Sequence, residues 1–273
     1  MSPKTLILGK GYIGSRLHEE MSSVLFESPI NNYSDAETII RRFKPKVLIN
    51  CIGFTGRNVD ECEKKKDATL LANTFVPIML GEACLRQKVK LVHISSGCIY
   101  QYDYKKDHPI NEEKFPDFLG LYYSRSKIYA EKALEVVLQR YPVLIVRIRI
   151  PLDNRQHPKN LLSKLVSYQK VINIPNSVTY IPDFVRALKH LLKIGAFGIY
   201  NVVNKGALRY PELMDIYKRY LPEFAYTKVD FKKLNLVRTN LLLSTQKLEK
   251  TGFKVRDIHA VLEECVRGYL RLR

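Results

Sequence analysis

The chain has 273 residues, of which 46% are hydrophobic and 26% charged, a globular composition that excludes disorder, a collagen repeat and a coiled coil. This length suits one α/β domain with a smaller appended lobe. The formal net charge of +18 indicates an acidic partner, but the basic residues are spread along the chain without a nucleic-acid motif. We therefore expect phosphate-bearing small ligands and no nucleic acid.

The cysteines point to a reducing compartment. There are five, scattered and without the spacing of metal ligands, which argues against a disulfide framework and against a metal site. The N-terminus leads directly into an apolar run without a signal-peptide layout, and no apolar run approaches the roughly 20 residues that cross a bilayer. We expect a cytoplasmic protein that does not associate with a membrane.

The first predicted element is a buried strand over Thr5–Leu8, followed at once by Gly9-Lys-Gly-Tyr-Ile-Gly14 and a helix over Ser15–Met21. Glycines between a strand and a helix permit a tight turn and a close approach of backbone to a pyrophosphate, whose charge lies at the helix N-terminus. This order of elements predicts dinucleotide binding.

The second predicted strand, Ser23–Phe26, ends at Glu27. An acid at that distance contacts the adenosine ribose and favours NAD, because a carboxylate repels a 2′-phosphate. Lys10 and Arg16 could instead favour that phosphate, so the residues leave the choice between NADH and NADPH open.

A helix over Asp35–Phe43 and an apolar strand over Val47–Gly53 come next. The strand end should lie beside the cofactor, and Arg57 in the following loop is either a ligand contact or an exposed loop arginine. A long helix is predicted from about residue 60 to 86. Asn73 is a polar residue in its apolar context, placed to brace the sheet or the cofactor loop.

A Ser–Tyr–Lys set follows. The strand Lys90–Ser95 runs into Ser96, and Tyr123 and Lys127 lie four residues apart at the start of a predicted helix, so both project from one face. Such a set performs carbonyl chemistry: Tyr123 exchanges a proton with a substrate oxygen that Ser96 holds by a hydrogen bond. Lys127 is expected to lower the pKa of Tyr123.

Strands alternate with helices, which predicts a Rossmann-like doubly wound parallel sheet. After a strand over Val143–Ile150 the pattern loosens. We predict a dinucleotide-binding domain over 1–155 and a substrate lobe over 156–273, with 178–204 packing back on the sheet. The later elements are helices over 161–169, 181–194, 210–220 and 258–270, a strand or loop over 171–177, and a strand over 198–203.

The glycine turn, Ser96, Tyr123 and Lys127 together resemble the extended short-chain dehydrogenase/reductase superfamily. Within it, the chain is similar to the nucleotide-rhamnose synthase/epimerase-reductases and, more generally, to the dTDP-4-dehydrorhamnose reductase group. The resemblance covers nearly the whole chain and rests on the segments Asn50–Glu63, Ser96–Tyr100, Arg147–Pro151, Asn173–Ser177, Arg238–Asn240 and Leu243–Leu248.

The resemblance implies a bifunctional enzyme that epimerises C3 and C5 of a UDP- or dTDP-linked 4-keto-6-deoxy-D-glucose and then reduces C4 with NADPH, or with NADH. Ser96, Tyr123 and Lys127 match its reductase set, and Cys98 and Lys164 match its epimerase pair. The implied cofactor-binding residues are Gly9, Lys10, Gly11, Tyr12, Ile13, Gly14, Glu27, Cys51, Ile52, Gly53, Asn73, Tyr123, Lys127 and Ile150. The implied substrate-binding residues are Thr55, Arg57, Ser96, Cys98, Asn160, Lys164, Asn176 and Arg238.

The chemistry of Cys98 suits that pairing. In an extended backbone, side chains two residues apart face the same way, so Cys98 should lie beside Ser96. A thiol exchanges protons near neutral pH when a positive neighbour lowers its pKa, and Lys164 could supply that charge or act as the opposing acid. The alternatives are a small buried hydrophobe for Cys98 and a helix cap for Asn160.

Two departures from the family stand out: the glycine turn is one residue shorter than Gly-x-x-Gly-x-x-Gly, and the segment between Tyr100 and Tyr123 is also shorter. Competing interpretations are a GDP-fucose synthase-like epimerase/reductase, a simple nucleotide-sugar 4-reductase, and a non-catalytic protein that keeps the fold. A homodimer is expected as the commonest oligomer.

Overall fold

The computed structural model describes residues 4–271, which form two compact units. Unit 1 consists of the chain up to residue 99 together with residues 116–147 and 194–200. Unit 2 consists of residues 100–115, 148–193 and the chain from 201 onward. Each unit is therefore assembled from segments that are separated in the sequence.

Unit 1 is built on a six-stranded sheet with strand order β2-β1-β3-β4-β5-β9. The strands are β1 (Thr5–Leu8), β2 (Val24–Phe26), β3 (Val47–Asn50), β4 (Lys90–Ser96), β5 (Leu144–Ile148) and β9 (Gly198–Asn201). The pairs of β1 with β2, β1 with β3, and β3 with β4 are parallel, and Leu48 lies opposite both Leu6 and Leu91. The predicted doubly wound parallel sheet is confirmed.

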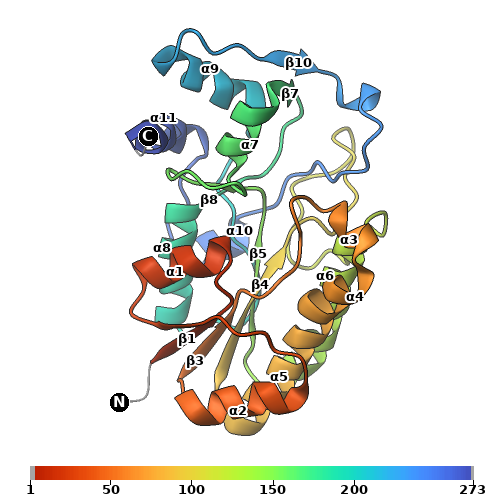
Figure 1. Ribbon diagram of the computed structural model, residues 1–273, viewed down its shortest axis with the longest axis vertical. Coiled ribbons are helices and arrows are strands. Elements are labelled where there is room, and N and C mark those ends of the chain that lie inside the picture. The colour runs from red at the N-terminus through yellow and green to blue at the C-terminus, as the bar shows by residue number, and fades with distance from the viewer. Residues whose placement is uncertain (1–3, 272–273) are drawn as a thin grey trace. The chain divides into compact units, whose positions relative to one another are not determined.

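Helices cover the sheet, as Figure 1 shows for α1 on one side and for α2, α5 and α6 on the other. Their bounds are Tyr12–Glu20, Tyr33–Phe43, Val76–Gln87 and Tyr122–Leu138. In α2 the Asn32 side chain accepts the Asp35 amide, and the helix ends at Lys44 in the left-handed conformation. Its apolar positions Ala36, Ile39 and Ile40 recur at helical spacing and enter a core with Leu48, Leu80 and Leu91.

The predicted helix over 60–86 is divided into α3 (Glu61–Lys64), α4 (Lys66–Leu70), a π-helix η1 (Leu71–Phe75) and α5. Lys65 interrupts it with a non-helical backbone, φ −118° and ψ 60°. Pro77 lies in the first turn of α5 and has no N–H to donate to residue 73, so the ordinary hydrogen-bond ladder fails there. Widened turns of this kind are frequent at functional sites.

The stretch Lys66–Gln87 corrects the expectation that no segment approaches the length of a membrane span. It has 22 residues and its most apolar window reaches a mean hydropathy of 1.4, enough by length and composition alone. Half of that window is buried, as in a helix that packs in a protein core. Here α5 packs on α2, α6 and β4, so the apolar composition has a structural explanation within unit 1.

Unit 2 contains two short parallel strand pairs and several helices. The pairs are β6 (Pro151–Leu152) with β8 (Thr179–Tyr180), and β7 (Lys170–Ile172) with β10 (Thr227–Val229). The helices are α7 (Leu161–Tyr168), α8 (Ile181–Lys193), α9 (Tyr210–Tyr220), α10 (Gln246–Glu249) and α11 (His259–Arg271), with a short 3₁₀ turn over Phe231–Lys233.

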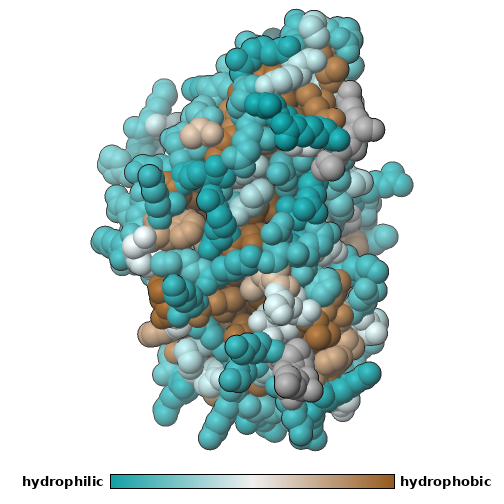
Figure 2. Space-filling model, turned by 90° about the vertical axis from the view of Figure 1, so that its left-hand side faces the viewer, coloured by the Kyte–Doolittle hydropathy of each residue, from teal (hydrophilic) through white to brown (hydrophobic). Residues whose placement is uncertain are grey.

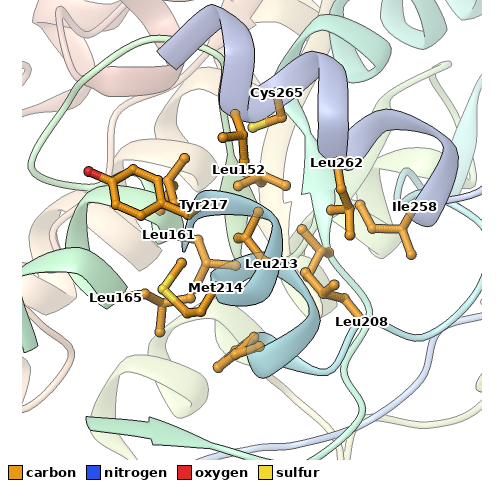
Figure 3. Packing of buried hydrophobic residues seen from close by; sticks show 14 of the residues in the cluster. Leu152, Leu161, Leu165, Leu208, Leu213, Met214, Tyr217, Ile258, Leu262 and Cys265 are labelled. Atoms are coloured by element: carbon orange, nitrogen blue, oxygen red, sulfur yellow. The ribbon is translucent and has the colours of Figure 1, made fainter. Parts of the chain in front are cut away.

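The core of unit 2 lies between α7, α9 and α11. Figure 3 shows Leu161 and Leu165 of α7, Leu213 and Tyr217 of α9, and Leu262 of α11 converging in one cluster. On α7 and α9 these residues lie four positions apart, and on α11 Leu262 is followed by the buried Cys265 and Val266, the spacing that gives each helix one apolar stripe. On the outer surface, the face drawn in Figure 2 is mostly hydrophilic with smaller hydrophobic areas between the polar side chains.

Candidate active site

The glycine turn connects β1 to α1 more tightly than predicted, because α1 begins at Tyr12 and not at Ser15. Gly9 has φ +96°, a backbone that side chains rarely adopt. Gly14 packs so closely that a Cβ there would lie 2.0 Å from the Gly9 carbonyl oxygen. By contrast, a Cβ on Gly11 would meet no protein atom within 4 Å.

These glycines provide a place for a pyrophosphate. Gly11 is the N-cap residue of α1 and has an extended backbone. It provides no side-chain hydrogen bond to the first turn of the helix, and that turn contains no acidic residue. The backbone N–H groups and the positive end of the helix dipole therefore remain available for an anion. β1 and β3 are adjacent although β2 lies between them in sequence, so the turn occupies the topological switch point, where α/β sheets bind ligands. The residues fit a dinucleotide cofactor.

Glu27 does not stand alone at the end of β2. Its carboxylate forms an exposed ion pair with Lys10, with 2.9 Å between Lys10 Nζ and Glu27 Oε1. Arg16 is buried and engages Glu19 and Glu20 of its own helix at 3.0 and 3.4 Å. The Lys10–Glu27 pair is therefore the charged feature beside the turn that bears on the choice of cofactor.

Asn73 fastens the loop after β3 to α6. Its Oδ1 accepts the Phe54 amide at 2.7 Å, and its Nδ2 donates to the Phe54 carbonyl at 2.9 Å and to Ser126 Oγ at 3.1 Å. This Asn73 belongs to η1, so the π-turn places a side chain that bridges the two segments. Cys51 and Ile52 of the same loop are half-buried and Gly53 is exposed, and a Cβ on Gly53 would lie 3.5 Å from Lys127 Nζ.

Ser96 and Tyr123 are brought together as predicted. Ser96 is the last residue of β4 and Tyr123 lies in the first turn of α6; both are buried, and their side chains are hydrogen-bonded. α6 is anchored to the segment after β4, since Ser124 Oγ donates to the Cys98 carbonyl at 2.5 Å. The hydroxyl pair at the carboxyl end of a parallel strand is the part of the site suited to hold a carbonyl oxygen.

The predicted effect of Lys127 on Tyr123 is wrong for this structure. Burial raises the pKa of Tyr123, a neighbouring Cys98 thiolate would raise it further, and only the hydrogen bond from Ser96 lowers it. The expectation considered the nearby positive charge and neglected desolvation, which is the larger effect for a fully buried phenol. Tyr123 is therefore a protonated acid at neutral pH.

Lys127 is shifted in the opposite direction. Burial lowers its pKa to about 8, while Glu131, Cys51 and Cys62 favour the charged form. Its Nζ donates to the Ile94 carbonyl at 3.4 Å. The ammonium is thus held within the core of unit 1 with a protonation equilibrium close to physiological pH.

The expected geometry of Cys98 is also wrong. β4 ends at Ser96 and residues 97–99 form a turn, in which the Cys98 amide donates to Ser96 Oγ at 3.1 Å. The serine hydroxyl captures the backbone two residues on and bends the chain, so the two side chains are not related by strand alternation. The half-buried Cys98 nevertheless lies close enough to Tyr123 to raise its pKa.

Sequence reasoning missed four groups around Lys127. The Cys62 thiol influences both Tyr123 and Lys127, and Asn50 Nδ2 donates to Nδ1 of the buried His93 at 3.2 Å. Glu131 and Arg147 form a buried ion pair at 2.5 Å. Two signals were available: Glu131 follows Lys127 by one helical turn, and Arg147 stands in a largely apolar strand.

Two of the predicted substrate contacts belong to the framework of unit 2. Asn160 caps α7: its Oδ1 accepts the amides of Asp153 and Leu162, both at 3.1 Å, and its Nδ2 donates to two carbonyls of the preceding loop. Asn176 accepts from Arg149 and Leu241 and donates to Asn240. Because the Asn160 amide is fully occupied, the helix-cap alternative describes Asn160, while the substrate contact of Asn176 stays a prediction.

The remaining predicted residues of unit 2 include a cationic cluster. Burial lowers the pKa of half-buried Lys164, and the charges of Lys159 and Arg238 lower it further. Such gathered positive charge is costly unless an anion offsets it. Ile150 has φ +40°, which is strained for a β-branched residue. In unit 1, Arg57 is exposed, and Tyr12, Ile13 and Thr55 are buried or half-buried.

Comparison with known proteins gives the relationships of this chain. The family model described as the RmlD substrate binding domain matches residues 4–209. A bifunctional dTDP-4-dehydrorhamnose 3,5-epimerase/dTDP-4-dehydrorhamnose reductase of Arabidopsis thaliana is 31% identical over 282 residues, covering 96% of this chain and 91% of its own. A trifunctional UDP-glucose 4,6-dehydratase/3,5-epimerase/reductase of the same plant is 31% identical over 91% of this chain, which spans 39% of its length.

Solved structures share the fold. A UDP-rhamnose synthase from Acanthamoeba polyphaga mimivirus matches with a TM-score of 0.88 and 24% identity, covering 97% of this chain and 99% of its own. A dTDP-4-dehydrorhamnose reductase from Bacillus anthracis, solved in complex with NADP, matches with a TM-score of 0.84 and 21% identity over 95% of this chain and 97% of its own.

Proposed function

Because the chain belongs to the RmlD substrate binding domain family, we propose that it is a bifunctional enzyme acting on UDP- or dTDP-4-keto-6-deoxy-D-glucose. It epimerises C3 and C5 and reduces C4 to give the L-rhamnose nucleotide. The observation that carries the proposal is the hydrogen-bonded Ser96–Tyr123 pair in unit 1, with Lys127 one turn along α6 and Cys98 close to Tyr123. The function named for the Arabidopsis thaliana bifunctional relative supports it.

The cofactor is a nicotinamide dinucleotide, and we propose NADPH. Gly9, Gly11 and Gly14 would hold its pyrophosphate at the start of α1, and Lys10 and Glu27 would lie beside its adenosine ribose. The related reductase solved with NADP supports the choice. When bound, this cofactor supplies a hydride to C4.

In the reduction, Ser96 and Tyr123 hold the C4 oxygen by hydrogen bonds, and Tyr123 gives its proton to that oxygen as negative charge develops there. The raised pKa of Tyr123 keeps the phenol protonated before the reaction, which is the form required of a proton donor. The tyrosinate that remains is stabilised by the positive charge of Lys127, and it regains a proton from solvent before the next cycle.

In the epimerisation, the protons on C3 and C5 are acidic because both carbons flank the C4 ketone. Cys98 is the proposed base that removes each proton, and the resulting enolate places its charge on the oxygen held by Ser96 and Tyr123. Lys164, taken over from the family resemblance, is the proposed acid that returns a proton to the opposite face. Cys98 then releases its proton to solvent and Lys164 takes one up, so that both groups are reset before the second carbon reacts. The hydrogen bonds from Ser96 and Tyr123 to the C4 oxygen thus assist both the epimerisation and the reduction.

The test is the reaction of purified protein with UDP-4-keto-6-deoxy-D-glucose and NADPH in D₂O, with the product identified by NMR, for the wild type and Cys98→Ala. The wild type should give an L-rhamnose nucleotide deuterated at C3 and C5, and Cys98→Ala should lose that exchange while keeping the fold. A D-configured product without deuterium at these carbons would make the protein a simple 4-reductase. No turnover would direct the same assay to the dTDP and GDP sugars, and failure with all three would refute the proposal.

A further inference from the structure

The space between α6 and the sheet contains a buried polar layer where an apolar core is expected. Lys127 and Glu131 project from α6 one turn apart and are 5% and 0% exposed. Ser95 of β4 and Arg147 of β5 face them and are also buried. Burying such polar and charged groups costs free energy unless they form hydrogen bonds or ion pairs with one another.

Glu131 is the centre of this layer. Arg147 donates to it with Nε, 3.0 Å from Oε2, and with Nη2, 2.5 Å from Oε2. Ser95 Oγ donates to the other carboxylate oxygen. Donors from two neighbouring strands therefore fix the orientation of a carboxylate on α6.

The charges in this layer do not cancel. Lys127 and Arg147 are two cations, and Glu131 is the anion they share. The other titratable groups that act on Lys127 or are acted on by it are Cys51, Cys62 and His93, and burial holds the pKa of each thiol up and that of the imidazole down. All three are therefore neutral, which leaves Glu131 as the charged group within this set that attracts the ammonium.

From this arrangement we propose that Glu131, oriented by Arg147 and Ser95, is a positioning residue that keeps the buried Lys127 side chain charged one helical turn away. The inference rests on the proposed function, in which Lys127 stabilises the tyrosinate formed at Tyr123. Arg147 moderates the effect, since it neutralises part of the Glu131 charge. The pair therefore sets the protonation of Lys127 and does more than fill the core.

The first experiment follows the protonation of Lys127 directly and needs no turnover. The ¹³Cε signal of Lys127, identified by its loss in Lys127→Arg, is followed by NMR from about pH 6 to pH 10. The wild-type midpoint should lie near 8. In Glu131→Gln it should fall by about one pH unit or more, and in Arg147→Met it should rise, because removal of the cation leaves Glu131 fully available to Lys127.

Opposite shifts separate an electrostatic role from a structural one, which would disturb both variants in the same way. Circular dichroism and NADPH binding report whether each variant folds, and a rise of the Lys127 midpoint in a folded Arg147→Met variant alone supports the electrostatic role, since loss of structure would not raise it. The control is Glu135→Gln on the same helix, because the Glu135 carboxylate pairs with Lys132 at 2.8 Å. In this variant the Lys127 midpoint should equal that of the wild type. An unchanged midpoint in a folded Glu131→Gln or Arg147→Met variant would overturn the inference.

The second experiment measures the pH dependence of kcat for C4 reduction. In Glu131→Gln the alkaline limb of the kcat profile should shift to lower pH by the same interval as the NMR midpoint of Lys127. At a fixed pH above that midpoint, kcat should fall about tenfold. A wild-type limb that does not follow the Lys127 midpoint would contradict the link to catalysis. If the wild type turns over no 4-keto sugar, the proposed function fails while the titration still decides the role of Glu131.

Discussion

Burial favours the neutral form of both titrating side chains at the start of α6. It raises the pKa of Tyr123 and lowers that of Lys127 to about 8. For a reductase the first shift is useful, because a protonated phenol is the reactant that the developing alkoxide needs. The second shift brings the pKa of Lys127 close to physiological pH. The charges of neighbouring groups therefore decide whether the Lys127 side chain is protonated.

Replacement of Tyr123 by Phe removes the proton donor and one hydrogen bond to the C4 oxygen. We expect kcat for C4 reduction to fall by about 10²–10⁴-fold, the contribution of a positioned general acid, a larger loss than that in cofactor affinity. Tyr122→Phe is the matched control, since that ring stacks with the Lys66 and Arg125 side chains. Steady-state kinetics and cofactor titration of both variants check this, and retained activity in Tyr123→Phe would contradict the assignment.

The exposed Lys10–Glu27 pair predicts how cofactor preference responds to charge. In Glu27→Gln, Lys10 loses its partner and the carboxylate no longer repels a 2′-phosphate. We expect the ratio of kcat/KM for NADPH to that for NADH to rise about two- to fivefold, the size of an exposed charge interaction. Glu19→Gln on α1 should leave the ratio unchanged. A fall of the ratio in Glu27→Gln would place Glu27 away from the ribose.

At the scale of elements, the turn between β1 and α1 contains two glycines that are needed for different reasons. Gly14 is required by the protein itself, because a Cβ would lie 2.0 Å from the Gly9 carbonyl oxygen and 3.3 Å from Cys51 Cβ. Gly11 is not required by any protein atom within 4 Å. We propose that its small size lets the pyrophosphate of a cofactor approach the backbone.

Alanine at each position should separate these two roles. Gly14→Ala overpacks the join and is expected to cost about 1–3 kcal/mol or more in folding stability, measured as a lower Tm. Gly11→Ala should keep the wild-type Tm and lose about tenfold in cofactor affinity. Thermal denaturation and cofactor titration distinguish them. Equal losses of Tm in the two variants would mean that Gly11 too is structural.

The order and type of most elements could be predicted from the sequence, because buried parallel strands are short apolar runs and the helices between them have apolar stripes. The interruptions could not. The turn after β4 arises when the Ser96 hydroxyl captures the Cys98 amide, and the widened turn η1 depends on Pro77 and on the partners of Asn73. Both are decided by contacts distant in sequence or by single hydrogen bonds.

At the scale of the whole molecule, spacing identified the Ser–Tyr–Lys set but not the charges that control it. Glu131 and Arg147 are separated by 16 positions and meet only because α6 packs across β5. Asn160 illustrates the opposite error: a polar residue in a motif-like segment was assigned to substrate, whereas its amide caps α7. Burial and pairing, which set both outcomes, are properties of the folded chain.

The net charge of +18 predicts a salt-sensitive encounter with an anionic substrate. Raising NaCl from about 20 to about 300 mM shortens the screening length below about 10 Å, so KM for the nucleotide sugar should rise about three- to tenfold with kcat nearly constant. Kinetics at matched ionic strengths with NaCl and sodium acetate check this and separate screening from competition by a specific anion. A constant KM would mean that the long-range field contributes nothing to binding.

The interleaved segments of the two units have a consequence for synthesis and folding. β9 completes the sheet beside β5, yet residues 148–193 of unit 2 are made between these two strands. While the nascent chain is shorter than about two hundred residues, β5 is an unsatisfied edge that can template wrong pairing. The sheet of unit 1 therefore cannot be completed until residues 148–193 of unit 2 have been made, and we expect the β5 edge to be prone to wrong pairing until then.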